Sequence, residues 1–367
     1  MSALRINIVL FGIENVGKAL INHVIECQKF HLEKKNIDIR FPIITNSELA
    51  YFEKEGVGKE WESNFILAAI PNTIDGIIEY AQEQNLENLI AVDFTDSKEL
   101  AKNYIKLIQN GFNIVASNKN ANILAFDFYK ELRENLEKFE KTFLYETSVG
   151  SGFPVIQSIR DLHSSGVKIT KIRGVFSDSL SYIFNRFSAE ESSFSSILID
   201  AEKLGLTKPD SREDLSGHDV AGKLLILARE IRENLELSDI RITSLLLPDL
   251  NEFNSKSEYE SSKELFDKLY RIAKLVQDDN HVLRYVGEFN VLENKLEVQL
   301  LSEPISSPTG KLKDSETVFE IYTQSYGEIP IVIKGVKAGK EAVARGVLTD
   351  VLKVIQKIKI KEPHLQY

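Results

Sequence analysis

The sequence predicts an α/β protein built from a doubly wound parallel sheet and a second, α+β domain. Three observations lead to this fold class. Residues 1–150 alternate short apolar runs with helical patterns, which is typical of a parallel sheet. The first run ends in the turn GIENVG (12–17), after which an amphipathic helical pattern begins. From residue 151 onward, long helical patterns stand beside strand-like segments without that regular alternation.

Within the first 150 residues, apolar runs predict the strands. The expected strands are 6–11, 37–45, 65–70, 89–94, 113–116 and 142–146. We expect helices between them, with clear apolar spacing over 16–30 and 97–111, and Gly111 ends the second of these helices. This order predicts a ligand crevice at the carboxyl ends of the strands.

The second region is expected to form a helix-covered sheet, which is a surface suited to dimerisation. Helical patterns cover 213–234 and 259–279, and the polar stretch 251–262 is expected to be a loop. The expected strands are 168–177, 282–291, 295–302, 316–325 and 329–336. A homodimer is the oligomer that this surface favours.

The C-terminal segment 340–358 is again helical in pattern. Val343, Val347, Val351 and Ile355 recur at four-residue spacing and predict one apolar face. We expect this helix to pack back on the first domain.

Composition and charge restrict the partners. The 367 residues suffice for two or three domains, and no apolar run approaches the ~20 residues of a membrane span. The formal net charge of -10 argues against nucleic-acid binding, so the expected partner is a small molecule. The single cysteine, Cys27, excludes an intramolecular disulfide. Since the start also resembles a first strand rather than a secretory signal, we expect a cytoplasmic protein.

The turn GIENVG indicates a Rossmann-like dinucleotide site that lacks its middle glycine. Gly12 and Gly17 are present, but Glu14 occupies the position where a pyrophosphate should approach the backbone. A carboxylate ~4 Å from a phosphate charge costs ~1 kcal/mol in water and ~4 kcal/mol at an effective dielectric of ~20. The helix dipole stabilises a bound phosphate by only ~0.3 to 1 kcal/mol. We therefore expect weakened binding unless Glu14 turns outward or meets a lysine; the alternative is a plain strand-to-helix turn.

Other segments carry candidate catalytic groups. Lys119 in SNKNA follows the fifth strand, and the segment 145–156 has two glycines and a proline that permit close backbone approach to a ligand. In 205–223, charged residues precede an apolar helix for which Ser216 or Asp214 is a plausible cap.

Asp219 and Lys223 lie four residues apart and share one helix face. They could form a surface ion pair worth ~0.3 to 0.5 kcal/mol. Facing a crevice, a lysine with a lowered pKa could instead donate a proton during carbonyl reduction. His218 points to another face, and no spacing of histidines and acidic residues predicts a metal site.

Taken together, the segments GIENVG, SNKNA, ETSVGSGFPVI, GVFSDSLSYIFN and EKLGLTKPDSREDLSGHDVAGK resemble homoserine dehydrogenases, and the similarity runs through essentially the whole chain. The resemblance implies reversible reduction of aspartate semialdehyde to homoserine in threonine and methionine biosynthesis, with a nicotinamide cofactor, NADP or NAD. It also implies a dinucleotide-binding domain over 1–150 that is completed by 336–367, and a substrate-binding and dimerisation domain over 151–335. Because the sequence begins at the first strand, we expect no preceding kinase half.

The resemblance also assigns roles to residues. Lys223 is the implied proton donor and acceptor, Asp219 its partner at the substrate hydroxyl, and Lys119 the second active-site lysine. The implied substrate-binding residues are Asp214, Lys208, Asp178, Ser179 and Glu146. The implied cofactor-binding residues are Gly12, Asn15, Val16, Gly17, Thr95, Ser117, Gly335 and Gly339.

Departures from the family pattern cluster at ligand-facing positions. The residues that differ are Glu14, Phe94, Asp178, Lys208, Gly222, Lys337 and Val343. One hypothesis is a working dehydrogenase with altered recognition, in which Asp178 holds the substrate ammonium and Lys208 the carboxylate, or in which the substrate has a second carboxylate. The other is a catalytically weak dimer that binds a metabolite or another subunit, its nucleotide site closed by an ion pair of Glu14 with Lys337 or Lys340.

The preference between the two nicotinamide cofactors depends on the end of the second strand. Its sequence ITNSEL has no acidic residue immediately there to hold a ribose 2′-hydroxyl, which favours NADP.

Overall fold

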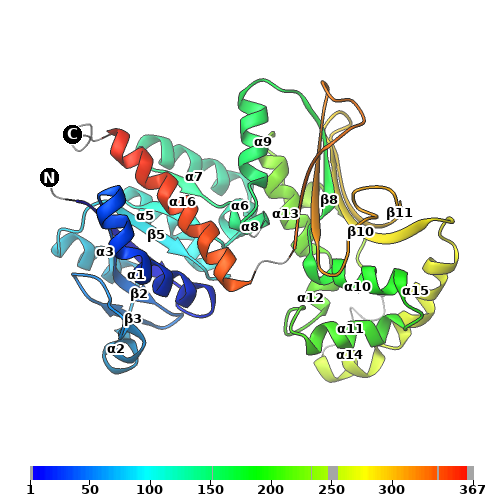
Figure 1. Cartoon of the computed structure of the whole chain (residues 1–367), viewed down its shortest axis with the longest axis horizontal. Coiled ribbons are helices and arrows are strands. Elements are labelled where there is room, and N and C mark those ends of the chain that lie inside the picture. The colour runs from blue at the N-terminus through cyan, green and yellow to red at the C-terminus, as the bar shows by residue number, and fades with distance from the viewer. Residues whose placement is uncertain (1–2, 151, 233, 247–254, 337–338, 362–367) are drawn as a thin grey trace. The chain divides into compact units, whose positions relative to one another are not determined.

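The computed structural model describes residues 3–150, 152–232, 234–246, 255–336 and 339–361 (Figure 1). The chain divides into two compact bodies. The first consists of Met1–Pro154 and Ala338–Tyr367, and the second is Val155–Lys337. Each body has its own sheet.

The sheet of the first body has the strand order β4-β3-β2-β1-β5-β6-β7. Five strands are parallel: β1 (Leu4–Phe11), β2 (Ile37–Thr45), β5 (Leu89–Asp93), β6 (Asn113–Ala116) and β7 (Phe143–Leu144). The remaining two, β3 (Leu49–Phe52) and β4 (Ile70–Pro71), add antiparallel pairs at one edge. The chain changes direction across the sheet between β1 and β5, which is where doubly wound folds bind ligands.

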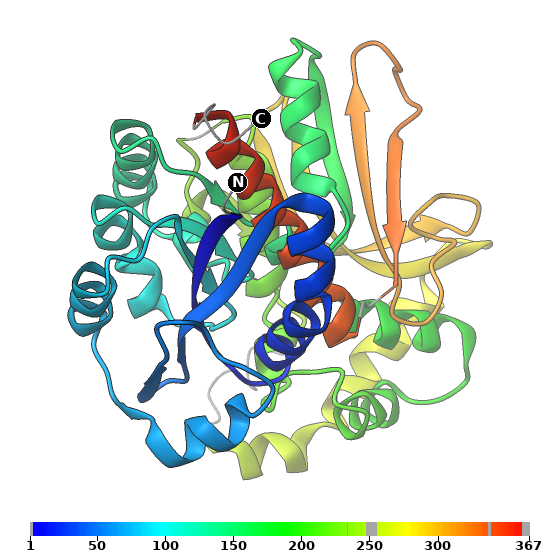
Figure 2. The same ribbon diagram turned by 60° about the vertical axis from the view of Figure 1, so that its left-hand side comes forward.

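Helices cover both faces of this sheet. On one face, α1 (Val16–Lys35) and α16 (Lys340–Lys361) run side by side in both ribbon views (Figures 1 and 2). Buried residues of α16, including Val347, Val351 and Ile355, share a hydrophobic core with strand residues such as Ile8. The expectation that the C-terminal helix packs on the first domain is confirmed.

The other face of the sheet is covered by a second set of helices. These helices are α3 (Ile74–Glu83), α5 (Tyr104–Gln109) and α7 (Phe126–Lys138). Their buried residues include Ile77, Leu107 and Leu132.

Three expectations for the first body need correction. The predicted strand 65–70 is wrong, because residues Trp61–Ala68 form α2, whose Trp61 and Phe65 enter the core one turn apart. A short apolar run does not distinguish a strand from a helix. The predicted helix 97–111 is divided into α4 (Lys98–Lys102) and α5. In 142–146 only two residues pair as β7, and α8 (Thr147–Gly150) follows.

The second body contains a six-stranded sheet in the order β13-β12-β8-β10-β11-β9. Its strands are β8 (Ile169–Val175), β9 (Ile240–Ile242), β10 (His281–Asn290), β11 (Lys295–Pro304), β12 (Thr317–Thr323) and β13 (Ile331–Gly335). Two helices, α10 (Asp178–Ala189) and α13 (His218–Arg229), pack against the middle of this sheet. The other helical segments are α9 (Val155–Ser164), α11 (Phe194–Lys203), α12 (Arg212–Leu215), η1 (Leu237–Asp239), α14 (Lys256–Ser262) and α15 (Leu265–Leu275).

Two expectations for the second body, one helix and one loop, are also corrected. The predicted helix 213–234 is interrupted at Gly217, which separates α12 from α13. Of the expected loop 251–262, residues 251–254 lie outside the described part, whereas Lys256–Ser262 form α14. Ser255 and Glu258 cap that helix reciprocally, a signal that the polar composition concealed. Among the described helices, none is long and apolar enough to cross a membrane.

Candidate active site

The turn after β1 retains two of the three glycine roles of a dinucleotide-binding loop. Gly12 has a positive φ of 92°, and its N–H donates to the carbonyl of Thr45 at 2.9 Å. A Cβ on Gly17 would lie 1.9 Å from the carbonyl oxygen of Gly12, so only glycine fits there. Asn15 occupies the N-cap position of α1 without a capping hydrogen bond from its side chain, and Val16 begins the helix. The exposed Glu14 remains the position that does not match.

A pocket of about 690 Å³ opens at the carboxyl ends of β1, β2 and β5. The expected residues Gly12 and Thr95 line it, together with Glu14. Its further lining includes Thr45, Asn46 and Ser47 of the ITNSEL segment, which the sequence linked to cofactor preference, and Asn72 and Thr73, which were not expected. The glycine cradle and the position at the crossover between β1 and β5 fit a dinucleotide, and the Glu14 carboxylate opposes its phosphates.

No ion pair closes this pocket among the residues that the structure describes. Glu14 has no ionic partner there, and Lys340 lies 4.0 Å from the carboxylate of its neighbour Glu341. Lys337, the other proposed partner of Glu14, lies outside the described residues. The open pocket favours the working-dehydrogenase hypothesis.

A buried aspartate at the end of β5 organises the edge of the pocket. The Asp93 carboxylate accepts hydrogen bonds from the hydroxyl of Tyr104 at 2.5 Å, the side-chain amide of Asn118 at 2.9 Å and the N–H of Thr95 at 2.6 Å. Burial raises the pKa of Asp93 above its usual range, and these three hydrogen bonds oppose that effect. Asn118 thereby holds the turn in which Lys119 caps α6 (Asn120–Ile123).

The remaining residues expected at the cofactor and substrate are Ser117, Glu146, Gly335 and Gly339. The N–H of Ser117 donates to the carbonyl of Asp93, and the N–H of the buried Glu146 donates to the carboxylate of Asp350 at 3.2 Å. Gly339 precedes α16 in the first body, whereas Gly335 ends β13 in the second.

Lys223 is the centre of a charged cluster in the second body. Its ammonium lies 3.0 Å from the carboxylate of Asp219 and donates a hydrogen bond to the carbonyl of Phe176 at 2.9 Å. The Lys223 side chain is 16% exposed, so this is no freely exposed surface pair. The ring of Phe176 stacks on Phe319, with ring centres 5.0 Å apart, which fixes the backbone that receives the ammonium.

The pKa of Lys223 is raised, contrary to the expectation from the sequence. Burial alone would lower this pKa, but the carboxylates of Asp219, Asp178 and Asp214 together outweigh burial. The sequence places only Asp219 beside the lysine, since the other two carboxylates come from α10 and α12. The Lys223 ammonium therefore stays protonated at neutral pH, so a proton is present for donation, while the raised pKa makes the ammonium a weaker acid.

Asp214 connects the substrate-region residues that the sequence singled out. Its carboxylate accepts from the hydroxyl of Ser179 at 2.7 Å and from the backbone N–H of Lys208 at 2.8 Å. Burial raises the pKa of Asp214. The expectation that Asp214 caps the following helix is wrong, because Gly217 occupies the cap position and Ser216 only accepts from the N–H of His218 at 3.3 Å.

Gly217 sets the angle between the two helices that carry these acids. It has a φ of 79°, and a Cβ there would lie 2.1 Å from the hydroxyl oxygen of Tyr285. The break at Gly217 therefore needs glycine for both its conformation and its contact. It was not expected from the sequence, although a glycine inside a helical pattern was the available signal.

Family comparisons match both bodies. A model described as the NAD-binding domain of homoserine dehydrogenase matches residues 12–146, and a homoserine dehydrogenase model matches residues 154–352. The chain belongs to the homoserine dehydrogenase family. The resemblance inferred from the sequence motifs and the fold class are thereby confirmed.

The relatives of this chain differ in how much of their own length the similarity covers. Homoserine dehydrogenase of Saccharomyces cerevisiae is 32% identical over 370 residues, covering 98% of this chain and 100% of the relative. The bifunctional aspartokinase/homoserine dehydrogenase of Haemophilus influenzae is 35% identical over 353 residues, which cover 96% of this chain but 43% of the relative. A crystal structure of a Candida auris protein of unknown function has a TM-score of 0.85 at 28% identity, covering 96% of this chain and 99% of that one.

Within the family framework, the structure separates the expected site residues into two groups. Six residues lie in the cluster of the second body: Lys223, Asp219, Asp214, Asp178, Ser179 and Lys208. The glycine loop, Thr95, Ser117, Lys119 and Glu146 belong to the first body. Sequence reasoning missed Asp93, Asn118 and the Phe176 carbonyl, although each lies in or beside a motif that drew attention.

Proposed function

We propose that this chain is a homoserine dehydrogenase that reversibly reduces aspartate semialdehyde to homoserine with NADP or NAD. The observation that carries the proposal is the partly buried Lys223 ammonium, held 3.0 Å from the carboxylate of Asp219 and 2.9 Å from the carbonyl of Phe176. Family membership supports the reaction class, and the open pocket beside Gly12 supports binding of a nicotinamide cofactor.

The chemistry assigned to the chain itself is proton transfer. When bound, a nicotinamide nucleotide supplies the hydride for reduction and accepts it in the reverse direction. Lys223 donates a proton to the aldehyde oxygen as that oxygen gains charge, so the aldehyde becomes an alcohol. In the reverse direction the neutral amine takes the hydroxyl proton, and because the pKa of Lys223 is raised this direction should gain as the pH rises. Asp219 orients the ammonium, and the Phe176 carbonyl fixes its second hydrogen bond.

For substrate recognition, we propose that Asp178 holds the ammonium and Lys208 the carboxylate. Both residues lie within electrostatic reach of the cluster. The charge of Asp178 helps to raise the pKa of Lys223, and the charge of Lys208 opposes the rise that burial causes in the pKa of Asp214. This exchange keeps an amino-acid substrate although Lys208 stands where the family pattern has a glutamate. Turnover of a substrate with a second carboxylate in preference to aspartate semialdehyde would favour the alternative recognition hypothesis.

NADP is the cofactor that we propose over NAD. The Asn46 side chain accepts hydrogen bonds from the N–H groups of Glu48 at 2.9 Å and Leu49 at 2.7 Å, which turns the end of β2 back on itself. The described lining there consists of Thr45, Asn46 and Ser47, with no acid to bind a ribose hydroxyl. A homodimer and a cytoplasmic location belong to the same proposal.

The test is aspartate-semialdehyde-dependent oxidation of NADPH, followed by absorbance. We expect the wild type to turn over and Lys223→Ala to lose turnover. The matched control His218→Ala should retain turnover, because His218 is exposed on the same helix. Unchanged turnover in Lys223→Ala would remove the assigned proton donor.

Fluorescence titration with NADPH separates a working enzyme from an inert relative. Binding at micromolar levels supports the dehydrogenase, and the Lys208→Glu variant then tests recognition. Absence of NADPH binding up to millimolar concentration, in both the wild type and Glu14→Gly, would instead support the catalytically weak homologue.

A further inference from the structure

Helix α15 carries apolar side chains on two faces. On the inner face, Phe266 and Tyr270 are fully buried. The ring of Tyr270 stacks on Phe194 with ring centres 4.0 Å apart, and its hydroxyl donates to the carbonyl of Leu245 at 2.7 Å. Because this inner face is filled, the apolar residues on the outer face have no place in the core of their own body.

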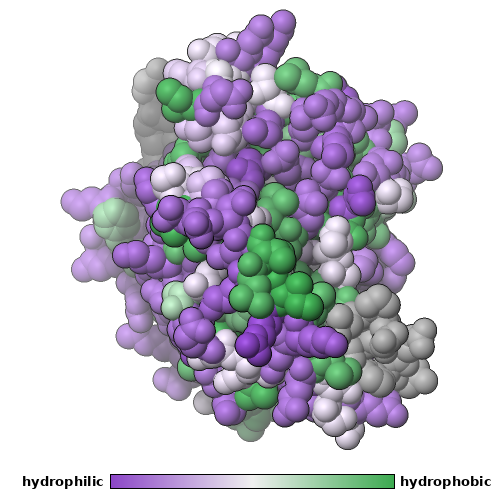
Figure 3. Space-filling view, turned by 90° about the vertical axis from the view of Figure 1, so that its right-hand side faces the viewer, coloured by the Kyte–Doolittle hydropathy of each residue, from purple (hydrophilic) through white to green (hydrophobic). Residues whose placement is uncertain are grey.

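The outer face of α15 forms an exposed apolar stripe. Its members are Leu265, Leu269, Ile272, Leu275 and Val276, whose exposed fractions range from 43% to 75%. Figure 3, which views the molecule from this side, shows a contiguous hydrophobic patch on its surface. Contiguous patches of this kind usually mark interaction sites on a water-exposed protein.

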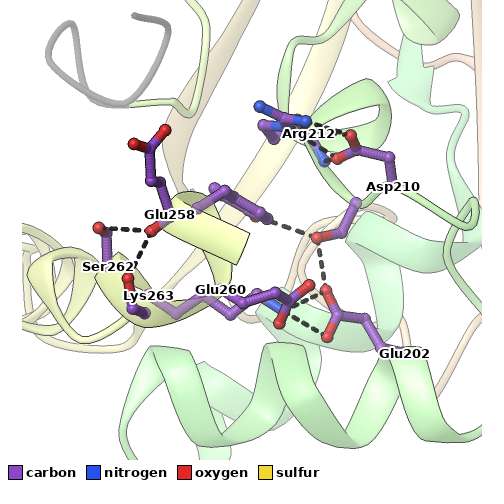
Figure 4. A network of polar contacts seen from close by, with 10 residues as sticks. Glu202, Asp210, Arg212, Glu258, Glu260, Ser262 and Lys263 are labelled. Carbon is purple, nitrogen blue, oxygen red and sulfur yellow. Dashed lines mark hydrogen bonds and ion pairs between the residues drawn. The ribbon is translucent and has the colours of Figure 1, made fainter. Parts of the chain in front are cut away.

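Buried polar contacts fix the direction in which the stripe points. The ammonium of Lys263, at the junction of α14 and α15, binds the carboxylate of Glu202 at 2.5 Å and that of Glu260 at 2.6 Å (Figure 4). Asp267 accepts hydrogen bonds from the backbone and hydroxyl of Ser195 at 2.7 and 2.8 Å. Since Glu202 and Ser195 both belong to α11, these contacts tie α15 to α11, and rotation of the stripe into the core would break them.

The spacing of the stripe fits another helix. Leu265, Leu269, Ile272 and Val276 are separated by four, three and four residues, the spacing of a coiled-coil seam. The seam is about 16 Å long, which corresponds to three turns of a partner helix. A seam this narrow covers less surface than the broad apolar face of a membrane-binding helix.

The charges beside the seam indicate which kind of partner helix would bind there. Lys268 and Arg271 are exposed along one edge of it, with Glu264 one turn before them, in a chain whose formal net charge is -10. A second copy of α15 packed antiparallel about its midpoint would bring these positive charges together near the symmetry axis. A helix with acidic residues along its edge would instead pair with them.

We propose that the seam on α15 docks an amphipathic helix with acidic edge residues, contributed by a different protein. This function is independent of the dehydrogenase chemistry, because none of the seam residues belongs to the Lys223 cluster.

The test uses two synthetic peptides with leucine at the seam positions of three heptads, one with glutamate and the other with lysine at the flanking positions. Fluorescence anisotropy should show that the glutamate peptide binds the full chain at least tenfold more tightly than the lysine peptide. Ile272→Glu should weaken binding at least tenfold. The double variant Lys268→Glu with Arg271→Glu should reverse the preference between the peptides.

The matched control is Leu292→Glu, which places the same charge at a side chain that is 78% exposed but lies outside α15. It should leave peptide binding unchanged, and thermal unfolding should show that all variants remain folded. Equal binding of both peptides, or equal loss in Leu292→Glu, would overturn the proposal. Two other results would also overturn it. A halved mass of Ile272→Glu in sedimentation would assign the seam to a second copy of this chain. Binding of the wild type to phosphatidylglycerol vesicles, abolished in Ile272→Glu, would assign the seam to a membrane surface.

Discussion

At the scale of single residues, the sign of one pKa shift decides what Lys223 can do. Burial favours the neutral amine, whereas three nearby carboxylates favour the ammonium, and the carboxylates prevail. The pairing of Lys223 with Asp219 could be predicted from their spacing. The contributions of Asp178 and Asp214 could not, because they depend on how three helices meet.

Asp219→Asn should move the alkaline limit of the reduction to lower pH. Reduction needs protonated Lys223, so activity falls as pH rises through the lysine pKa. Asp219 raises that pKa, and its neutral isostere removes this effect while burial remains. The measurement is kcat/KM against pH for the wild type and the variant. An unchanged or higher alkaline limit in the variant would contradict the assigned coupling.

Glu14→Gly should tighten NADPH binding. Removing a carboxylate near the phosphates recovers at least ~1 kcal/mol, which is about fivefold in Kd, and the gain should shrink as salt screens the charge. Fluorescence titration at low and high ionic strength measures both effects. Glu48→Gln serves as a control, since Glu48 is exposed and does not line the pocket. Equal tightening in this control would assign the effect to net charge rather than to the loop.

At the scale of secondary-structure elements, glycines and caps determined which sequence patterns could be interpreted correctly. Gly12 and Gly17 predicted the turn after β1, because Gly12 has a positive φ and Gly17 leaves no room for a side chain. The run around Phe65 was misassigned as a strand, because its apolar residues do not reveal that Trp61 and Phe65 share one helix face. Local patterns thus specify turns better than short apolar segments.

Gly217→Ala should destabilise the second body and reduce turnover. The new methyl group would require the Tyr285 hydroxyl to move, and the left-handed backbone adds about 1 to 2 kcal/mol. Gly166→Ala is the matched control, with a φ of 80° and no atom within 4 Å of the added carbon. Thermal unfolding should show a larger loss in Gly217→Ala. Equal losses in the two variants would indicate backbone strain alone, without the contact to Tyr285.

At the scale of the whole molecule, the chain divides its chemistry between two bodies. The first combines the N-terminal residues with α16 and holds the glycine loop, and the second holds the Lys223 cluster. The sequence motifs allowed this division to be anticipated, since each motif lies at a strand end or a helix start. The Asp93 network could not be anticipated, because Tyr104 and Asn118 meet it only through the folded sheet.

The most direct test of the central claim is transfer of a labelled hydride. The wild type is incubated with aspartate semialdehyde and NADPH that carries deuterium on the nicotinamide ring, in both stereochemical forms. Mass spectrometry should find homoserine one mass unit heavier with one of the two forms, and none in Lys223→Ala. Absence of labelled homoserine with either form, at cofactor concentrations that saturate binding, would contradict the assignment.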